Sequence, residues 1–190
     1  MVKVFVLLKN GFEEIEALTI VDYLRRADIE VALVSVEDSL DLLGAHQIGV
    51  KADMMFEDLK PEEVDLLFLP GGLPGASSLR DDKKVIELIK DLDHNGRAIA
   101  AICAAPIVLS RARVIADKKV TSYPGFEDQL VCNQYVEDLV VVDENIISSR
   151  GPASAVYLAL DLIGLLKGDK KREEIRKDIL LDKVEENIRS

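Results

Sequence analysis

The sequence predicts an α/β fold in which a mostly parallel sheet is covered by helices on both faces. Short runs of apolar, often β-branched residues alternate along the chain with segments of helical periodicity. The apolar runs are nearly continuous, as expected for strands that are buried on both faces. The length of 190 residues further predicts that residues 1–190 form one domain.

The first half of the chain contains the clearest strand and helix patterns. The run Val2–Leu8 predicts a buried strand. Glu14–Ala27 predicts a helix with one apolar stripe and acidic residues at its positive end. Further strands are expected at Glu30–Val36 and Asp65–Leu69, whereas residues 40–56 are irregular and predict a small hairpin or a flap.

The second half continues the alternation. It is expected to contain a helix at Lys83–Leu92, a strand at Ala98–Ile102, a short helix just after Cys103, a hairpin of Leu139–Val142 and Ile146–Ser149, and a buried helix at Ala153–Leu166. From Gly168 onward, mixed charges and apolar residues near helical spacing predict an amphipathic helix. It could pack on its own domain or dock on a second subunit.

Composition and charge exclude several classes of protein. Hydrophobic residues make up 48% and charged residues 31%, which is typical of a globular protein. The net charge of −11 opposes binding to nucleic acids and to anionic membranes. The two cysteines, Cys103 and Cys132, cannot form a disulfide framework, which indicates a reducing compartment. The apolar N-terminal run is too short to span a bilayer and no cleavage site follows it, so we expect a soluble, cytoplasmic protein.

Unusual residues follow three of the predicted strands. Acidic residues follow the first strand, Gly71–Gly72 follows Asp65–Leu69, and Cys103 follows Ala98–Ile102. Ligands of parallel sheets bind beyond the carboxyl ends of the strands, so these residues are expected to form one site.

Cys103 lies where a strand turns directly into a helix through small residues, which is the pattern of a nucleophile elbow. The N–H groups of the new helix would point at the sulfur and lower the pKa of the thiol. The backbone N–H groups of Gly71–Gly72 could form an oxyanion hole together with the N–H of Ala104. The alternatives are a buried structural cysteine and an ordinary glycine turn.

Other titratable residues are assigned by their context. Glu13 and Glu14 are expected to compensate the helix dipole, whereas Glu16 beside a thiolate would stay protonated and donate a hydrogen bond to the sulfur. His46 could reach the site from the irregular segment. Neither histidine has zinc-ligand spacing to a cysteine, so no metal is expected. No GxGxxG loop follows the first strand, so no organic cofactor is expected.

Four motifs in order resemble the ThiJ/PfpI superfamily, in the branch of Parkinson disease protein 7 and its bacterial relatives. They are Gly11–Glu16, Leu69–Gly72, Ala100–Pro106 and Ser149–Pro152. The resemblance covers nearly the whole chain and implies a flavodoxin-like three-layer sandwich that forms a homodimer. It also implies that Cys103 is the reactive, easily oxidised cysteine, that Glu16 is the protonated glutamate in contact with it, and that Gly72 and Ala104 are backbone donors.

Two positions depart from the superfamily pattern. Tyr123 stands where the histidine near the cysteine is expected, and tyrosine is a poor base near neutral pH. The protease-like branch has a histidine directly after the cysteine, where this chain has Ala104. Because no histidine follows Cys103, the sequence argues against proteolysis.

Two functional hypotheses remain. In the first, the protein is a glyoxalase III- or deglycase-like hydrolase or lyase, in which Cys103 attacks a small reactive carbonyl such as a 2-oxoaldehyde. In the second, it is a non-enzymatic redox sensor or chaperone-like stress protein that is switched when an oxidant converts Cys103 to a sulfinate.

Overall fold

The structure is a computed structural model, and it describes residues 2–189. The strands are β1 Lys3–Leu8, β2 Glu30–Ser35, β3 Asp41–Leu43, β4 Gly49–Lys51, β5 Met54–Met55, β6 Leu66–Leu69, β7 Ala98–Ile102, β8 Lys119–Val120, β9 Gln134–Tyr135, β10 Val140–Asp143 and β11 Ile146–Ser149. The helices are α1 Glu14–Arg26, α2 Gly75–Asp81, α3 Lys83–His94, α4 Pro106–Ala112, α5 Ala155–Lys167, α6 Asp169–Asp178 and α7 Leu181–Arg189.

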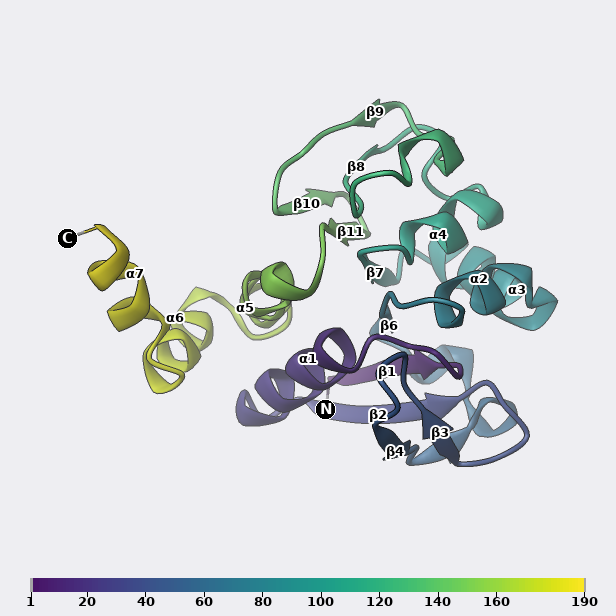
Figure 1. The fold of residues 1–190 in the computed structure, drawn as a ribbon, viewed down its shortest axis with the longest axis horizontal. Coiled ribbons are helices and arrows are strands. Elements are labelled where there is room, and N and C mark those ends of the chain that lie inside the picture. Colours follow the sequence, from purple (N-terminus) through teal and green to yellow (C-terminus); the bar gives the residue numbers. More distant parts are fainter. Residues whose placement is uncertain (1, 190) are drawn as a thin grey trace.

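A seven-stranded sheet with the order β10-β11-β7-β6-β1-β2-β5 forms the centre of the molecule (Figure 1). All neighbouring strands in it are parallel except β10 and β11, which form an antiparallel hairpin at one edge. The fold is therefore a flavodoxin-like α/β sandwich, as the sequence predicts.

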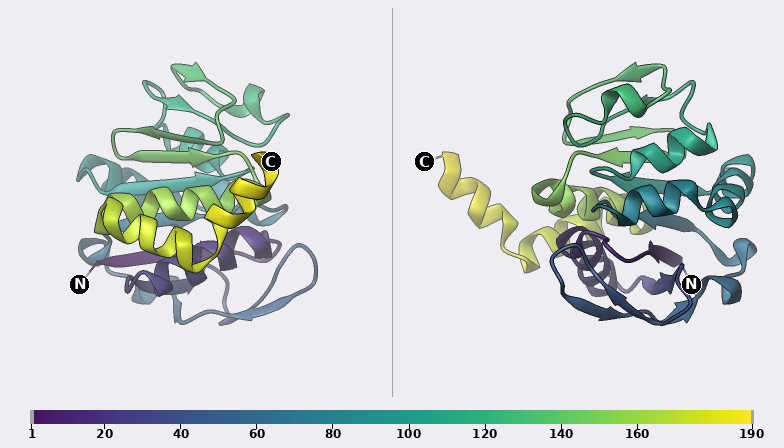
Figure 2. Two further views of the ribbon diagram at one scale, coloured as in Figure 1. Left: turned by 90° about the vertical axis from the view of Figure 1, so that its left-hand side faces the viewer. Right: turned by 45° about the vertical axis from the view of Figure 1, so that its right-hand side comes forward.

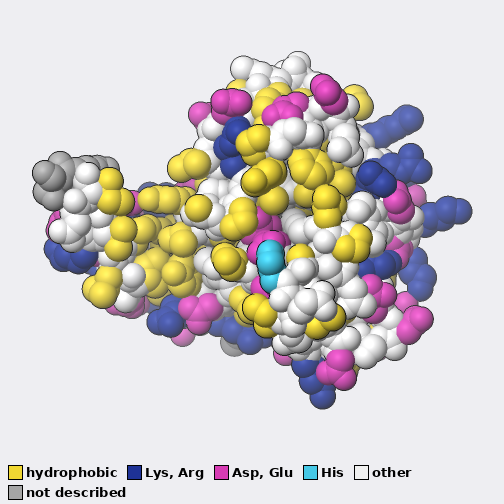
Figure 3. All heavy atoms as spheres, viewed as in Figure 1, with side chains coloured by type: hydrophobic (Ala, Val, Ile, Leu, Met, Phe, Trp, Pro, Cys, Tyr) yellow, Lys and Arg dark blue, Asp and Glu magenta, His cyan; other side chains and the backbone are white. Residues whose placement is uncertain are grey.

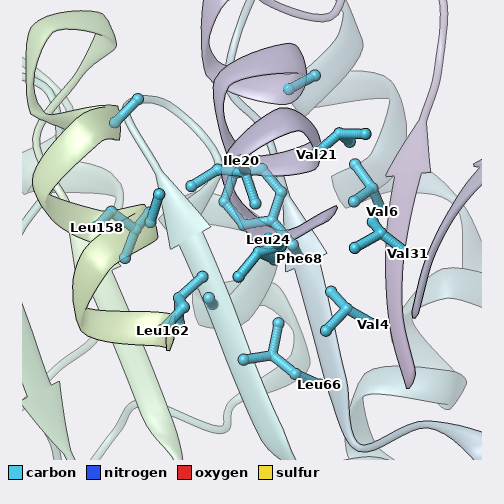
Figure 4. Packing of buried hydrophobic residues seen from close by; sticks show 14 of the residues in the cluster. Val4, Val6, Ile20, Val21, Leu24, Val31, Leu66, Phe68, Leu158 and Leu162 are labelled. Carbon is cyan, nitrogen blue, oxygen red and sulfur yellow. The ribbon is translucent and has the colours of Figure 1, made fainter. Parts of the chain in front are cut away.

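The strands have buried side chains on both sheet faces, and each face has its own core. On one face, helices α1 and α5 pack on the sheet, where Phe68 lies among Leu24 and Leu158 (Figure 4). Helices α2, α3 and α4 cover the other face. This double burial explains why the strands appear in the sequence as continuous apolar runs.

The irregular segment of residues 40–56 forms the β3–β4 hairpin and the short edge strand β5. The hairpin is fixed to the loop between β1 and α1, because the Gly11 N–H donates to the Leu43 carbonyl over 2.8 Å. The Ala45 N–H likewise donates to the Phe12 carbonyl over 2.8 Å. The hairpin is thus held beside the first turn of α1.

The C-terminal segment forms two helices and not one. The break follows α6, where Leu180 adopts a left-handed conformation with φ +59°. Helix α6 packs on α5 and buries Ile175, whereas Val184 and Ile188 of α7 are exposed. Helix α7 projects from the body of the protein (Figure 2). Packing on the same domain therefore describes α6 and the start of α7, where Leu181 lies against the core, but not the exposed apolar residues further along α7. Within residues 2–189, no helix combines the length and apolarity needed to cross a bilayer.

Candidate active site

Three strand ends meet at one edge of the sheet and bring the predicted site residues together. Strands β7, β6 and β1 are neighbours and run parallel, so their carboxyl ends lie side by side. A side chain at Gly71, after β6, would place its Cβ 2.7 Å from the Cβ of Cys103 and 2.7 Å from Oε2 of Glu16. Only glycine fits at this contact, because real Cβ atoms do not approach so closely.

Gly72 is required for a second close approach. Its φ is +87°, and a Cβ there would lie 2.3 Å from the backbone nitrogen of Glu13. The Glu13 N–H in turn donates to the Gly71 carbonyl over 2.9 Å. The glycine turn is therefore locked to the start of α1, which carries Glu16.

Cys103 occupies a sharp turn directly after β7. Its φ is +62°, a left-handed conformation that costs a non-glycine residue about 1–3 kcal/mol. The Cys103 N–H donates to the Ser149 carbonyl, and its carbonyl accepts from the Tyr123 N–H, each over 2.9 Å. Helix α4 begins three residues later at Pro106. This strained strand–turn–helix geometry is that of a nucleophile elbow.

Glu16 is completely buried. Its Oε2 accepts the Gly71 N–H over 2.8 Å, and the carboxyl lies close enough to the Cys103 thiol for the two groups to shift each other's pKa. Its Oε1 is buried and has no hydrogen-bond partner among residues 2–189. Burial, with a smaller contribution from the charge of Glu13, raises the pKa of Glu16 to about 7.

The Cys103 thiol is also affected chiefly by burial. Burial, followed by the negative charge and hydrogen bond of Glu16, raises the pKa of the thiol to about 12. The N–H groups of Ala104 and Gly72 face the sulfur and lower this pKa without outweighing burial. The expectation that the helix field gives a lowered thiol pKa is therefore wrong, because the sulfur is largely withdrawn from water.

Glu16 and Cys103 titrate as a pair because the two acidic groups are in contact. Burial raises the pKa of the carboxyl to about 7 and that of the thiol to about 12. Between these values it holds one proton and one negative charge. The Gly71 N–H stabilises that charge on the carboxylate, and the Gly72 and Ala104 N–H groups stabilise it on the sulfur.

Tyr123 lies beside the site through its backbone. Its N–H donates to the Cys103 carbonyl, and its ring packs against Gly151. The side chain is 47% exposed. Tyr123 therefore borders the solvent side of the site.

The role of Glu14 could not be predicted from the sequence. This carboxylate is buried and accepts hydrogen bonds from the backbone N–H and from Nδ1 of His46, over 2.8 and 2.9 Å. Burial raises the pKa of Glu14, but the hydrogen bonds from His46 and from the backbone N–H groups of Glu14 and Ile48 together outweigh it and leave the pKa lowered. Glu14 thus links α1 to the β3–β4 hairpin by hydrogen bonds and does not simply compensate the helix dipole.

Glu13, Glu14 and His46 form a cluster with metal-ligand chemistry. Each offers one atom, and the three atoms lie within 4.8 Å of one another. The hairpin brings His46 to the two acids across 32 residues of sequence, so no local spacing could reveal the cluster.

Cys132 packs against the core of the other sheet face, and burial raises its pKa.

Comparison with known proteins gives consistent results. The model of the DJ-1/PfpI family matches residues 2–165. Protein DJ-1 homolog A of Arabidopsis thaliana is 35% identical over 94% of this chain, which spans only 46% of that relative's length. A deglycase of Pyrococcus horikoshii is 35% identical over 87% of this chain and 99% of its own. The solved structure of oxidized DJ-1 from Toxoplasma gondii is 38% identical, covers 95% of this chain and 98% of its own, and superposes with a TM-score of 0.91.

Replacing Glu16 with Gln should stabilise the protein at pH 8 but not at pH 4. In the folded state the pKa of Glu16 is raised from 4.5 to about 7, so wild-type stability falls as the pH rises through this window. Gln stays neutral, and the variant should gain roughly 3 kcal/mol in free energy of unfolding at pH 8. Urea unfolding at both pH values measures the difference, with the exposed Glu62→Gln as control for the loss of one charge. A gain that does not depend on pH would contradict the assignment.

Replacing Gly71 with Ala should disrupt the site. The new methyl group would collide with Cys103 and Glu16, and we expect a loss of about 1–3 kcal/mol of stability. The rate of Cys103 alkylation by iodoacetamide should change by at least about tenfold, since the thiol and carboxyl must separate. Gly49→Ala is the matched control, because nothing lies within 4 Å of a Cβ there. Unchanged alkylation in Gly71→Ala would show that the close contact is not needed.

Proposed function

The chain belongs to the DJ-1/PfpI family, and from this premise we propose that it is a cysteine-dependent stress-response protein that acts on small reactive carbonyls. The reaction would be glyoxalase III- or deglycase-like, and residues 1–190 would act as a single ThiJ/PfpI-like domain. The observation that supports this best is the contact between the Cys103 thiol and a buried Glu16 carboxyl whose pKa is about 7. A group with this pKa is suited to exchange protons near neutral pH.

In the proposed first step, the sulfur of Cys103 attacks the aldehyde carbon of a 2-oxoaldehyde. The thiol proton moves to Glu16, a carbon–sulfur bond forms, and the electron pair of the carbonyl moves to its oxygen. Glu16 then returns the proton to that oxygen, which completes a neutral hemithioacetal. The N–H groups of Gly72 and Ala104 face the sulfur and are placed to stabilise negative charge next to it.

The geometry argues against a thiol protease. A protease of this kind needs a histidine base on the nucleophile. Nδ1 of His46 is instead bonded to Glu14, and Tyr123 stands in the position of the superfamily histidine. Tyr123 is included in the proposed site as a residue that borders the substrate, not as a base.

A second function is favoured by the same N–H groups. If peroxide oxidises Cys103 to a sulfinate, the donors of Gly72 and Ala104 and a protonated Glu16 would hold the new oxygens. The protein would then be a non-enzymatic redox sensor or a chaperone-like protein controlled by this oxidation.

We further propose a cytoplasmic homodimer that needs no metal or organic cofactor for the reaction. Exposed apolar side chains support the dimer, since Ile15 and Leu18 lie on α1 and Leu165 lies on α5. Hydrophobic surface gathers on the side of the molecule that carries helices α5 to α7 (Figure 3). An interface that included α1 would border Glu16, one turn or less from Ile15 and Leu18.

The carbonyl reaction is tested by measuring D-lactate formed from methylglyoxal. Cys103→Ser should lose activity at least about 100-fold, because the nucleophile is removed, whereas Cys132→Ser should keep it. The wild-type rate should rise with pH through about 7, as the Glu16–Cys103 pair loses its first proton. In Glu16→Gln this rise should move to higher pH, because the buried thiol must then ionise without a carboxylate to take its proton.

Absence of D-lactate from the wild type would contradict the enzymatic proposal. Mass spectrometry after mild peroxide treatment then tests the sensor. Selective gain of two oxygens on Cys103, and not on Cys132, is the expected outcome.

The dimer is tested by light scattering. Leu18→Glu should shift the protein towards the monomer, because a charge buried in an apolar interface is unfavourable. Val131→Glu changes an equally apolar exposed residue outside α1 and should leave the mass unchanged. A monomeric wild type would contradict this part of the proposal.

A further inference from the structure

A cavity of about 490 Å³ lies where the ends of helices α2, α3 and α4 meet, on the sheet face opposite α1 and α5. Lys and Arg side chains gather along the edge of the molecule that carries these helices (Figure 3). We call this feature the basic cavity; it is lined by Arg80, Asp81, Lys83, Ile86, Glu87, Lys90, Arg111 and Arg113.

Three cations of the basic cavity form no direct ion pair, although Arg111 lies close enough to Asp81 for its charge to act on that carboxylate. Arg80 pairs with Asp81 through two bonds of 2.8 Å, and Lys90 pairs with Glu87 over 2.9 Å. Within residues 2–189, Lys83, Arg111 and Arg113 have no carboxylate within ion-pair distance. This concentration of positive charge occurs in a chain whose net charge is −11.

Helix dipoles offset only a small part of this positive charge. Helices α2 and α4 end at the cavity, and each contributes at most about half a negative charge. Helix α3 begins there and contributes about half a positive charge. The three helix ends together contribute about half a negative charge, which is far less than the three positive charges of Lys83, Arg111 and Arg113. Lys83 is the first residue of α3, where a cation is unfavourable for the helix dipole, and the acid at this helix end is the N-cap residue Asp82, which accepts from the Lys84 N–H.

Arg113 adopts a left-handed backbone conformation that favours glycine. It caps α4 with φ +64°, where glycine is the common choice and arginine costs about 1 kcal/mol. Its N–H still bonds to the carbonyls of Leu109 and Ser110. The arginine therefore adds a positive charge to the cavity at the expense of local stability. Capping the helix does not require that charge, because a glycine could cap it as well.

We infer that the basic cavity binds a small anion with two or more negative charges on phosphate groups. Arg111 and Arg113 form no direct ion pair and offer planar, two-pronged donors that suit phosphate oxygens, and Lys83 adds a third charge at the N-terminus of α3. The volume of about 490 Å³ lies within the range of small-molecule sites. Inorganic pyrophosphate and a sugar bisphosphate share this chemistry.

This inference does not depend on the function of Cys103. Helix α4 starts near Cys103 and ends at Arg111 and Arg113, so its length of roughly 10 Å separates the two places. The variant Cys103→Ser should bind the anion like the wild type, and its binding should persist if the carbonyl reaction is not found.

Isothermal titration calorimetry with pyrophosphate tests the inference. The wild type should bind, and binding should weaken as salt is added. Arg113→Gly removes one cation and relieves the backbone, so a loss of affinity in this variant does not reflect unfolding. The pair of substitutions Arg111→Gln and Arg113→Gly should lower the affinity at least about tenfold. Lys51→Gln, which removes an exposed cation of β4, should leave it unchanged.

Fructose 1,6-bisphosphate and sulfate complete the experiment. Tighter binding of the bisphosphate than of pyrophosphate would support the inference and identify a phosphate ester as the preferred source. Equal binding of sulfate and pyrophosphate would overturn it, because non-specific attraction of anions to the positive charge would then explain the binding. Absence of binding at millimolar concentrations, or unchanged affinity in the doubly substituted variant, would also overturn it. Tight binding of a single-stranded oligonucleotide that is lost in that variant would replace it with a nucleic-acid surface.

Discussion

The candidate site depends on how closely Gly71 approaches Cys103 and Glu16. No Cβ fits at Gly71, and none fits at Gly72 against the nitrogen of Glu13. These contacts lock the ends of β6 and β7 to the first turn of α1, so the carboxyl and the thiol meet without any flexible segment between them. Preorganisation of this kind requires a rigid frame, and the two cores on either side of the parallel sheet supply it.

Burial of Glu16 connects the stability of the fold with the chemistry of the site. Withdrawal from water raises the pKa of the carboxyl to about 7 and that of the thiol to about 12. The folded protein therefore disfavours a second negative charge at the site, and the pair keeps one proton over the neutral range. An uncharged side chain would be more stable in this position but could not accept the proton of an attacking thiol.

Most of the fold could be predicted from the sequence, because doubly buried strands and amphipathic helices leave clear patterns. Strand β7 and the β10–β11 hairpin follow directly from such patterns. Helix α2 was not predicted, since its glycine and two serines resemble a loop and packing stabilises it. The contact of Glu14 with His46 and the high pKa of Cys103 also escaped prediction. They depend on a hairpin contact and on depth of burial, which are properties of the folded chain alone.

Helix α4 shows where local rules are broken. It has seven residues. Cys103, three residues before its start, and Arg113, its C-cap, both adopt left-handed conformations that favour glycine. At Asp28, Gln47 and Glu144, a short turn simply accommodates a polar residue in this conformation. Around α4 the unfavourable conformations instead present a thiol to Glu16 and a cation to the basic cavity. Strain that persists where a glycine would relieve it indicates that the side chain itself is needed. The same reasoning that identifies the nucleophile elbow from Cys103 therefore applies, at the other end of the helix, to Arg113.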